Sequence, residues 1–146
     1  MDRRKKGSKH FLLVDAGGTP LVPRLTAANV NDVTQLRALV GAIGPIGGKP
    51  GARLRTPKAV VADRGFDSDQ NRGWLAARGI RPLIARRFTD HGSGLGVWRW
   101  VVEQTLALLH QFRRLRVRDE RRDDLHEAFL SLGCALICWR RLGGYI

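Results

Sequence analysis

The chain has 146 residues, which favours a single domain, because most domains contain about 100 to 200 residues. Its hydrophobic residues, 43% of the total, are enough to build a buried core and argue against disorder, while no apolar run reaches the roughly 18 to 20 residues of a membrane span. Lys and Arg total 26 against 13 Asp and Glu, a net charge of +13 that favours a polyanionic partner such as nucleic acid.

Apolar runs and turn residues divide the chain into four strands and four helices. The predicted strands cover residues 10–16, 21–27, 59–63 and 80–85. The predicted helices cover residues 33–43, 68–79, 97–112 and 123–141. The turn GGTP joins the first two strands, and the Gly-rich stretches 44–58 and 86–96 predict surface loops. The order β-β-α-β-α-β-α-α predicts an α/β fold.

Helix ends and faces follow from particular residues. Asn31 or Asp32 is the expected N-cap of the first helix, Asp67 or Ser68 caps the second, and Gly79 ends it. In the last helix, four residues at helical spacing are expected on the core side: Leu125, Phe129, Leu132 and Leu136. The same helix carries both cysteines, Cys134 and Cys138, which we expect in the core rather than in a metal site or a disulfide scaffold.

Three acids follow the third predicted strand in the stretch VVADRGFDSD. Asp63 closes the strand, and ligand crevices in open α/β sheets lie beyond the carboxyl ends of strands. Asp67 and Asp69 are better interpreted as acids that cap or complement the start of the next helix. A strand-end acid after VVA caps nothing obvious, so Asp63 is the candidate for chemistry.

The helix expected at 97–112 is mostly apolar but carries a polar stripe. Arg99, Glu103 and His110 lie within about 40° of one another at about 100° per residue, and Gln104 and Gln111 lie on a different face. In a buried helix such a stripe needs partners. Two interpretations stay open: a structural pair between Arg99 and Glu103, or a metal-binding carboxylate flanked by cations that contact phosphate.

A strand-end Asp and a helical Glu on a basic domain favour the second interpretation. Mg²⁺ or Mn²⁺ prefers oxygen ligands, and a pair of such ions can activate the attacking oxygen and stabilise the leaving oxygen in phosphodiester transfer. Surrounding arginines and lysines would hold the nucleic-acid backbone, whose phosphates dominate affinity.

Several stretches, in this order along the chain, resemble the C-terminal part of the DDE transposases of bacterial insertion sequences, above all the group named for insertion sequence five. These stretches are GSKHFLLVDAGGTPLVPRLTAANVNDVTQL, ADRGFDSD, ARGIRPLIARR, HGSGLGVWRWVVEQTLALLHQFRRLRVR and HEAFLSLGCALICWRRL. The resemblance covers nearly the whole chain. It implies a ribonuclease H-like catalytic domain in which two Asp and one Glu bind a divalent metal for DNA cleavage and strand transfer.

The resemblance also implies roles for individual residues. Asp63 matches the second acid of the family and Glu103 the third. The family places a Tyr-Arg-Glu-Lys signature around that Glu, and here Arg99 stands at the Arg position, Gly96 at the Tyr and His110 at the Lys. Beyond the helix, four arginines continue the basic surface expected to bind nucleic acid: Arg113, Arg114, Arg116 and Arg118.

The first catalytic Asp of the family would lie on a strand upstream of GSKHFLLVDAGG. Residues 1–9 form only a basic lead-in here, so we expect an N-terminally truncated ribonuclease H-like segment over 10–146 that lacks the first strand and leaves a gap in the sheet. Asp15 matches the turn after the second strand of the family, Asp2 lies in a polar lead-in, and Asp32 is better interpreted as a helix cap.

The predicted function is therefore a transposase catalytic segment, inactive alone, that acts on insertion-sequence ends with Mg²⁺ or Mn²⁺. Its partners would be DNA, an upstream transposase half joined by frameshifting, and further copies of itself in a transposition complex. A decayed remnant of an element is the other origin that the sequence allows. The alternative functions are a non-catalytic basic nucleic-acid-binding protein and a related metal-dependent nuclease. The expected location is the bacterial cytoplasm, at the nucleoid when bound to DNA.

Overall fold

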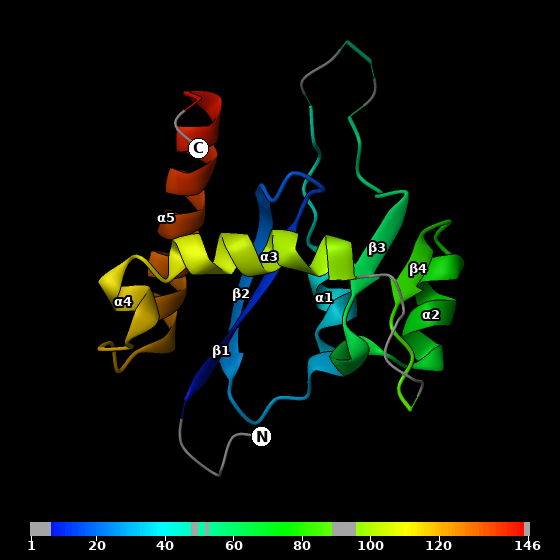
Figure 1. Ribbon diagram of the computed structural model, residues 1–146, viewed down its shortest axis with the longest axis horizontal. Helices are drawn as coiled ribbons and strands as arrows, with labels where there is room; N and C mark the ends of the chain where they lie inside the picture. The colour runs from blue at the N-terminus through cyan, green and yellow to red at the C-terminus, as the bar shows by residue number, and fades with distance from the viewer. Residues whose placement is uncertain (1–6, 48–49, 52, 89–95, 145–146) are drawn as a thin grey trace. The chain divides into compact units, whose positions relative to one another are not determined.

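A computed structural model describes residues 7–47, 50–51, 53–88 and 96–144 of the chain (Figure 1). The fold divides into two compact units. One consists of Met1–Val30 together with Trp100–Ile146, and the other consists of Asn31–Arg99.

The first unit begins with a hairpin, blue in Figure 1. Strands β1 (Ser8–Val14) and β2 (Pro20–Ala27) pair antiparallel, as the sequence predicts. Asp15 closes the turn, because its Oδ1 accepts hydrogen bonds from the backbone N–H groups of Gly17 at 2.9 Å and Thr19 at 2.8 Å. Asp15 is therefore a turn residue, in agreement with its interpretation from the sequence.

Helices α3 (Gly96–Leu109), α4 (Arg113–Arg116) and α5 (Asp123–Leu142) follow, and all of α5 and most of α3 belong to the first unit. Helix α5 packs against β2. A core cluster joins the three helices, and its buried members are Leu109, Leu115, Leu130, Cys134 and Ile137. Burial raises the pKa of the Cys134 thiol to about 11, with a smaller contribution from Cys138. Both cysteines are free, and the buried Cys134 confirms the expected core position.

The core face of α5 differs from the predicted one at three of the four predicted residues, whereas Phe129 packs against the core cluster as expected. Leu125, Leu132 and Leu136 are 45%, 56% and 38% exposed, while Leu130 and Ile137 are buried. The other buried residues of this helix are His126, Gly133 and Cys134. Two stripes at helical spacing run along α5, and the stripe with the larger apolar side chains is the outer one. The stripe that contains Gly133 is the buried one because Gly133 lets α4 approach α5 closely. A Cβ at this position would lie 2.9 Å from Leu115 Cδ1.

Helix α3 is shorter and more exposed than expected. It ends at Leu109 rather than near Phe112, and the polar residues Arg99, Glu103 and His110 are all exposed. Gln104 and Gln111 are exposed too, so the three polar residues do not form a buried stripe. Among the α3 residues whose burial is described, Thr105 and Leu109 are buried, and the Thr105 hydroxyl donates to the Gly18 carbonyl at 2.8 Å.

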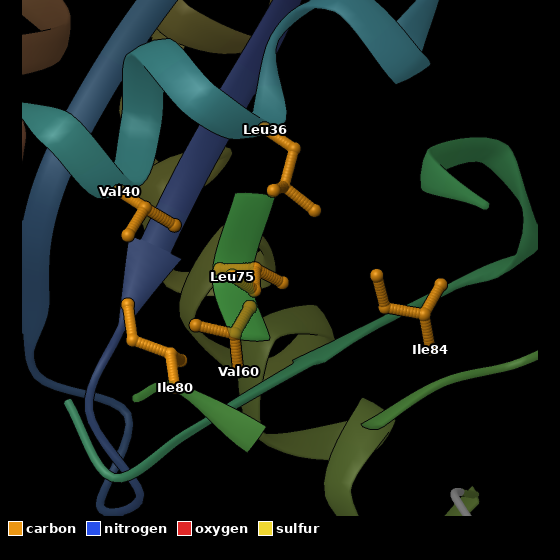
Figure 2. Packing of buried hydrophobic residues seen from close by; sticks show 6 residues of the cluster. All are labelled: Leu36, Val40, Val60, Leu75, Ile80 and Ile84. Atoms are coloured by element: carbon orange, nitrogen blue, oxygen red, sulfur yellow. The ribbon is translucent and has the colours of Figure 1, made fainter. Parts of the chain in front are cut away.

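The second unit contains a parallel pair of strands, β3 (Ala59–Ala62) and β4 (Arg81–Ile84). Two helices, α1 (Leu36–Gly41) and α2 (Asp69–Ala76), accompany them. Figure 2 shows the six buried side chains that form the core between these elements: Leu36, Val40, Val60, Leu75, Ile80 and Ile84. Gly79, with a φ of +69°, lets the chain leave α2 and enter β4, and so confirms the predicted helix end.

Two short 3₁₀ helices that the sequence did not predict complete the second unit, η1 (Asp32–Thr34) and η2 (Arg64–Phe66). Each sheet has two strands in the described part of the chain, β1 with β2 and β3 with β4. The mixture of strands and helices confirms the α/β class. Among the described residues, no helix is both long and apolar enough to cross a membrane.

Candidate catalytic and nucleic-acid-binding residues

Asp63 lies at the carboxyl end of β3, where the sequence places it. Its side chain caps η2, because Oδ1 accepts a hydrogen bond from the Gly65 backbone N–H at 2.9 Å. The expectation that Asp63 caps nothing is therefore wrong. The reason is local: RGF forms one turn of 3₁₀ helix directly after the strand, and a strand-end Asp is then in the N-cap position.

A second acid lies close to Asp63. A Cβ built on Gly65 would be 3.0 Å from Asp32 Oδ2 and 3.0 Å from Asp63 Oδ1, so these two oxygens lie no more than twice that distance apart. Of the two helix caps that the sequence suggests, Asn31 and Asp32, Asp32 is not the one observed. Asn31 has that role, since its side chain accepts from the Val33 N–H at 3.2 Å. The absence of a side chain at Gly65 leaves room for both carboxylates.

Asn71 holds the two 3₁₀ helices that carry these acids. Its side chain is buried in α2, and its amide nitrogen donates to the Val33 carbonyl at 2.8 Å and to the Phe66 carbonyl at 3.1 Å. Its oxygen accepts from Arg37 Nε at 3.3 Å. Sequence reasoning passed over Asn71, because an asparagine in the first turns of a helix has no pattern that distinguishes a buried bridge from an exposed side chain.

Asp67 and Asp69 have structural positions, as predicted, although neither is the cap. Ser68 caps α2 by accepting from the Asn71 N–H at 3.1 Å. Asp67 accepts from Arg72 Nη2 at 2.7 Å and from the Arg87 backbone N–H at 2.8 Å. Burial would raise the pKa of Asp67, but the hydrogen bonds from Arg87 and Arg72 outweigh it and hold that pKa below its usual range. Asp69 lies in the first turn of α2.

Glu103 and Arg99 lie one turn apart on α3, and both side chains are exposed. Glu103 belongs to the first unit and Asp63 to the second, so the contacts of each predicted acid are those within its own unit. In the parts of the chain that the structure describes, no group of three or more His, Cys, Asp or Glu side chains is arranged to hold a metal ion.

The predicted nucleic-acid-binding arginines differ in their freedom to contact phosphate. Arg113 has a side chain 84% exposed, 3.9 Å from Asp119, and Arg116 is also exposed. Arg114 instead forms an ion pair of 2.5 Å with Glu120 and lies 5.1 Å from the Phe129 ring centroid. Arg114 therefore already has a structural role on α4.

His110 lies beside two other histidines. The His10 ring centroid is 5.8 Å from that of His110, and His10 Nε2 is 2.9 Å from His126 Nε2. His126 is buried, and its Nδ1 lies 3.3 Å from Glu120 Oε2. Burial, with repulsion from His126 and His110, lowers the pKa of His10 to about 4. The hydrogen bond from Arg114 lowers the pKa of Glu120.

A basic α/β chain with a carboxylate at the end of a parallel strand fits the class of proteins that act on nucleic-acid phosphates. Comparison with known families makes the class specific: residues 2–92 match the Transposase DDE domain, and the chain belongs to that family. A Burkholderia cepacia protein named as a transposase for insertion sequence element IS402 is 61% identical over 141 residues, which are 97% of this chain and 67% of the relative. No solved structure matches the chain.

Proposed function

We propose that the chain is the part of an insertion-sequence transposase that carries two of its three catalytic acids, Asp63 and Glu103. The observation that supports this most directly is the position of Asp63: it ends a strand that is parallel to its neighbour, and a hydrogen bond fixes one of its oxygens. The reaction would be metal-dependent phosphodiester cleavage and strand transfer at the ends of an insertion sequence. The relative's name, a transposase for an insertion sequence element, supports this proposal.

The chemistry of the acids fits Mg²⁺ or Mn²⁺, since both ions prefer carboxylate oxygen. We assign Asp63 and Glu103, each in its own unit, the role of a metal ligand that the resemblance implies for it, and the resemblance places a third acid upstream of GSKHFLLVDAGG. When bound, the ion would polarise the phosphodiester and activate the attacking oxygen. Two groups of this chain position the Asp63 carboxylate. The Gly65 N–H orients it through a hydrogen bond, and Asn71 fixes the turn in which Asp63 lies.

The basic residues would hold the DNA backbone. Arg113 and Arg116 have exposed side chains on α4, and Arg99 and His110 are exposed on or just after α3. Arg114 contributes to DNA binding mainly by stabilising α4 and less by contacting phosphate, because its side chain already forms an ion pair with Glu120. Contacts of this kind position DNA without reading its sequence.

The finer fold that we propose is ribonuclease H-like, completed by a strand supplied from outside this sequence. The α/β class of the described elements supports it. The strand would carry the first Asp, and the chain alone would be inactive. The second candidate is a basic DNA-binding protein without catalysis, which the net charge of +13 supports by itself.

The test uses this chain joined to the part of the Burkholderia cepacia relative that the alignment does not cover, with transposition of a marked element as the readout. Asp63→Asn is the informative variant, because Asn caps helices as well as Asp but carries no charge. We expect it to keep the stability of the parent and to reduce transposition at least a hundredfold, as should Glu103→Gln.

Asp69→Asn is the control matched to Asp63→Asn. It makes the same change at an exposed carboxylate six residues further along the chain and in the same unit. It should leave transposition within about twofold of the parent, and DNA affinity should be unchanged in all three variants. Transposition by the Asp63→Asn protein at the level of the control would refute the catalytic assignment and favour the binding function.

A further inference from the structure

The outer face of α5 carries a continuous apolar stripe. Its members, here called the outer stripe, are Leu125, Ala128, Leu132, Ala135, Trp139 and Leu142. All six are exposed, and the large ones markedly: Leu132 by 56%, Trp139 by 72% and Leu142 by 86%. Monomeric proteins rarely leave an apolar surface of this extent open, so the stripe calls for a partner.

The stripe lies directly opposite the packed side of the helix. Buried Leu130 is two residues from both Ala128 and Leu132, which is about 160° around the helix in either direction. The outer stripe therefore points away from β2, and none of its members belongs to the core cluster of its own unit. Leu132 also borders a hollow beside Leu115 and Phe129.

The spacing of the stripe is that of a helix-pairing seam. Its members follow one another at intervals of 3, 4, 3, 4 and 3 residues, the alternation by which two helices pack side by side. Large and small side chains alternate through the first four members: Leu125, Ala128, Leu132 and Ala135. A partner that fits the middle of the seam must present large groups opposite Ala128 and Ala135 and a small group opposite Leu132.

We propose that the partner is a second copy of this chain whose α5 runs antiparallel to the first. In that arrangement Leu132 lies opposite Ala135 of the second copy, and Ala128 lies opposite Trp139 of the second copy. Leu125 and Leu142 then meet at the ends of the seam. One register satisfies all these pairs and their symmetry mates, as a two-fold interface requires. A parallel pair would instead place Trp139 against Trp139 and Ala135 against Ala135.

Charge favours the same orientation. Helix α5 has Asp123 and Asp124 in its first turn and Arg140 and Arg141 in its last. Antiparallel pairing opposes the two helix dipoles and places Arg140 and Arg141 of each copy near Asp123 and Asp124 of the other, which also pair with Arg118 and Arg122 of their own chain. Parallel pairing would bring Arg140 and Arg141 of the two copies together and align the two helix dipoles.

Sedimentation equilibrium of the purified chain tests the surface. One helix pair is a small interface, so we expect dimers with a Kd on the order of 1 to 100 µM. Leu132→Asp, at the centre of the stripe, should raise that Kd at least tenfold. Leu54→Asp is the control, because Leu54 is 69% exposed in the second unit. Circular dichroism should show unchanged helix content, since neither side chain is buried.

A pair of introduced charges tests the orientation. Ala128→Glu alone and Trp139→Lys alone should each weaken the dimer, because each places a charge in an apolar seam. The double variant should recover at least tenfold over either single variant, since antiparallel pairing sets each new Glu against a new Lys of the second copy. These positions are eleven residues apart in one helix, too far for a pair within the chain.

A chain that stays monomeric at several hundred micromolar would overturn the proposal and leave the stripe to a different protein or to the remaining part of a longer transposase. Dimers that Leu132→Asp does not weaken would overturn the choice of surface. Dimers that are weakened by Leu132→Asp but not restored in the double variant would overturn the antiparallel register. Pairing through α5 is independent of catalysis, so neither test depends on the assignment of Asp63 or Glu103.

Discussion

Replacing Gly133 by Ala tests the packing of α5 against its own unit. Gly133 is buried in the middle of α5, and a Cβ at this position would lie 2.9 Å from Leu115 Cδ1, 3.0 Å from Leu109 Cδ2 and 3.5 Å from Phe112 Cδ2. Leucine methyl groups can often rotate away from such a contact. Leu109 is 0% exposed, however, so its methyl group would have to move within a packed core, whereas Leu115 also borders a hollow beside Gly133.

Two effects of opposite sign decide the magnitude. Ala in place of Gly stabilises a helix interior by about 0.5 to 1 kcal/mol, because it reduces the entropy of the unfolded chain. Overpacking a core costs about 1 to 3 kcal/mol. We therefore expect Gly133→Ala to lower the free energy of unfolding by about 1 kcal/mol.

Gly73→Ala in α2 is the matched control, because nothing lies within 4 Å of its Cβ position. It should raise the free energy of unfolding by about 0.5 to 1 kcal/mol, since only the helix effect remains. Urea denaturation followed by circular dichroism measures both, with expected shifts of the midpoint in opposite directions. Equal stabilisation by the two substitutions would refute the close packing of Gly133 against α3 and α4.

Two further predictions concern the acids and the histidines. Gly65→Ala should reduce transposition of the completed enzyme at least tenfold with a small effect on stability. The reason is that its Cβ would meet Asp32 Oδ2 and Asp63 Oδ1 at 3.0 Å each. Transposition at the parental level would show that the two carboxylates move freely. Stability should fall as the pH falls from 6.5 to about 4, since the unfolded chain takes up a proton that folded His10, with its lowered pKa, does not. In urea titrations at several pH values, His10→Gln should flatten this dependence, and an unchanged slope would contradict the role of His10.

The order of the elements could be predicted because the signals are local. The turn GGTP, the cap at Ser68 and the left-handed Gly79 each mark a boundary within a few residues. The predicted bounds of α5, 123–141, differ from the observed Asp123–Leu142 by one residue. The prediction that failed, the buried face of α5, depends on tertiary contacts. Helical period locates stripes, but it does not tell which of two apolar stripes will face β2.

The surroundings of the acids also required the fold. Asp32 and Asp63 are 31 positions apart in sequence, and they approach because η1 packs against η2 while Asn71 bonds to both. No sequence pattern within either stretch predicts the contact between η1 and η2. The exposed Arg113 and the paired Arg114 are neighbours of the same type, and only the position of Glu120 on the folded chain distinguishes them.

The capping role of Asp63 and its proposed role in catalysis are compatible, although the sequence presented them as alternatives. A carboxylate has two oxygens, and the cap engages Oδ1 through the Gly65 N–H. That hydrogen bond restricts rotation of the carboxylate and so fixes the direction of Oδ2, which is the oxygen that would bind a metal ion. Carboxylates that bind metals are commonly oriented by a hydrogen bond of this kind. The cap would thus prepare Asp63 for its ligand, and because Asn preserves the cap without the charge, a loss of transposition in Asp63→Asn at unchanged stability would separate the two roles in one experiment.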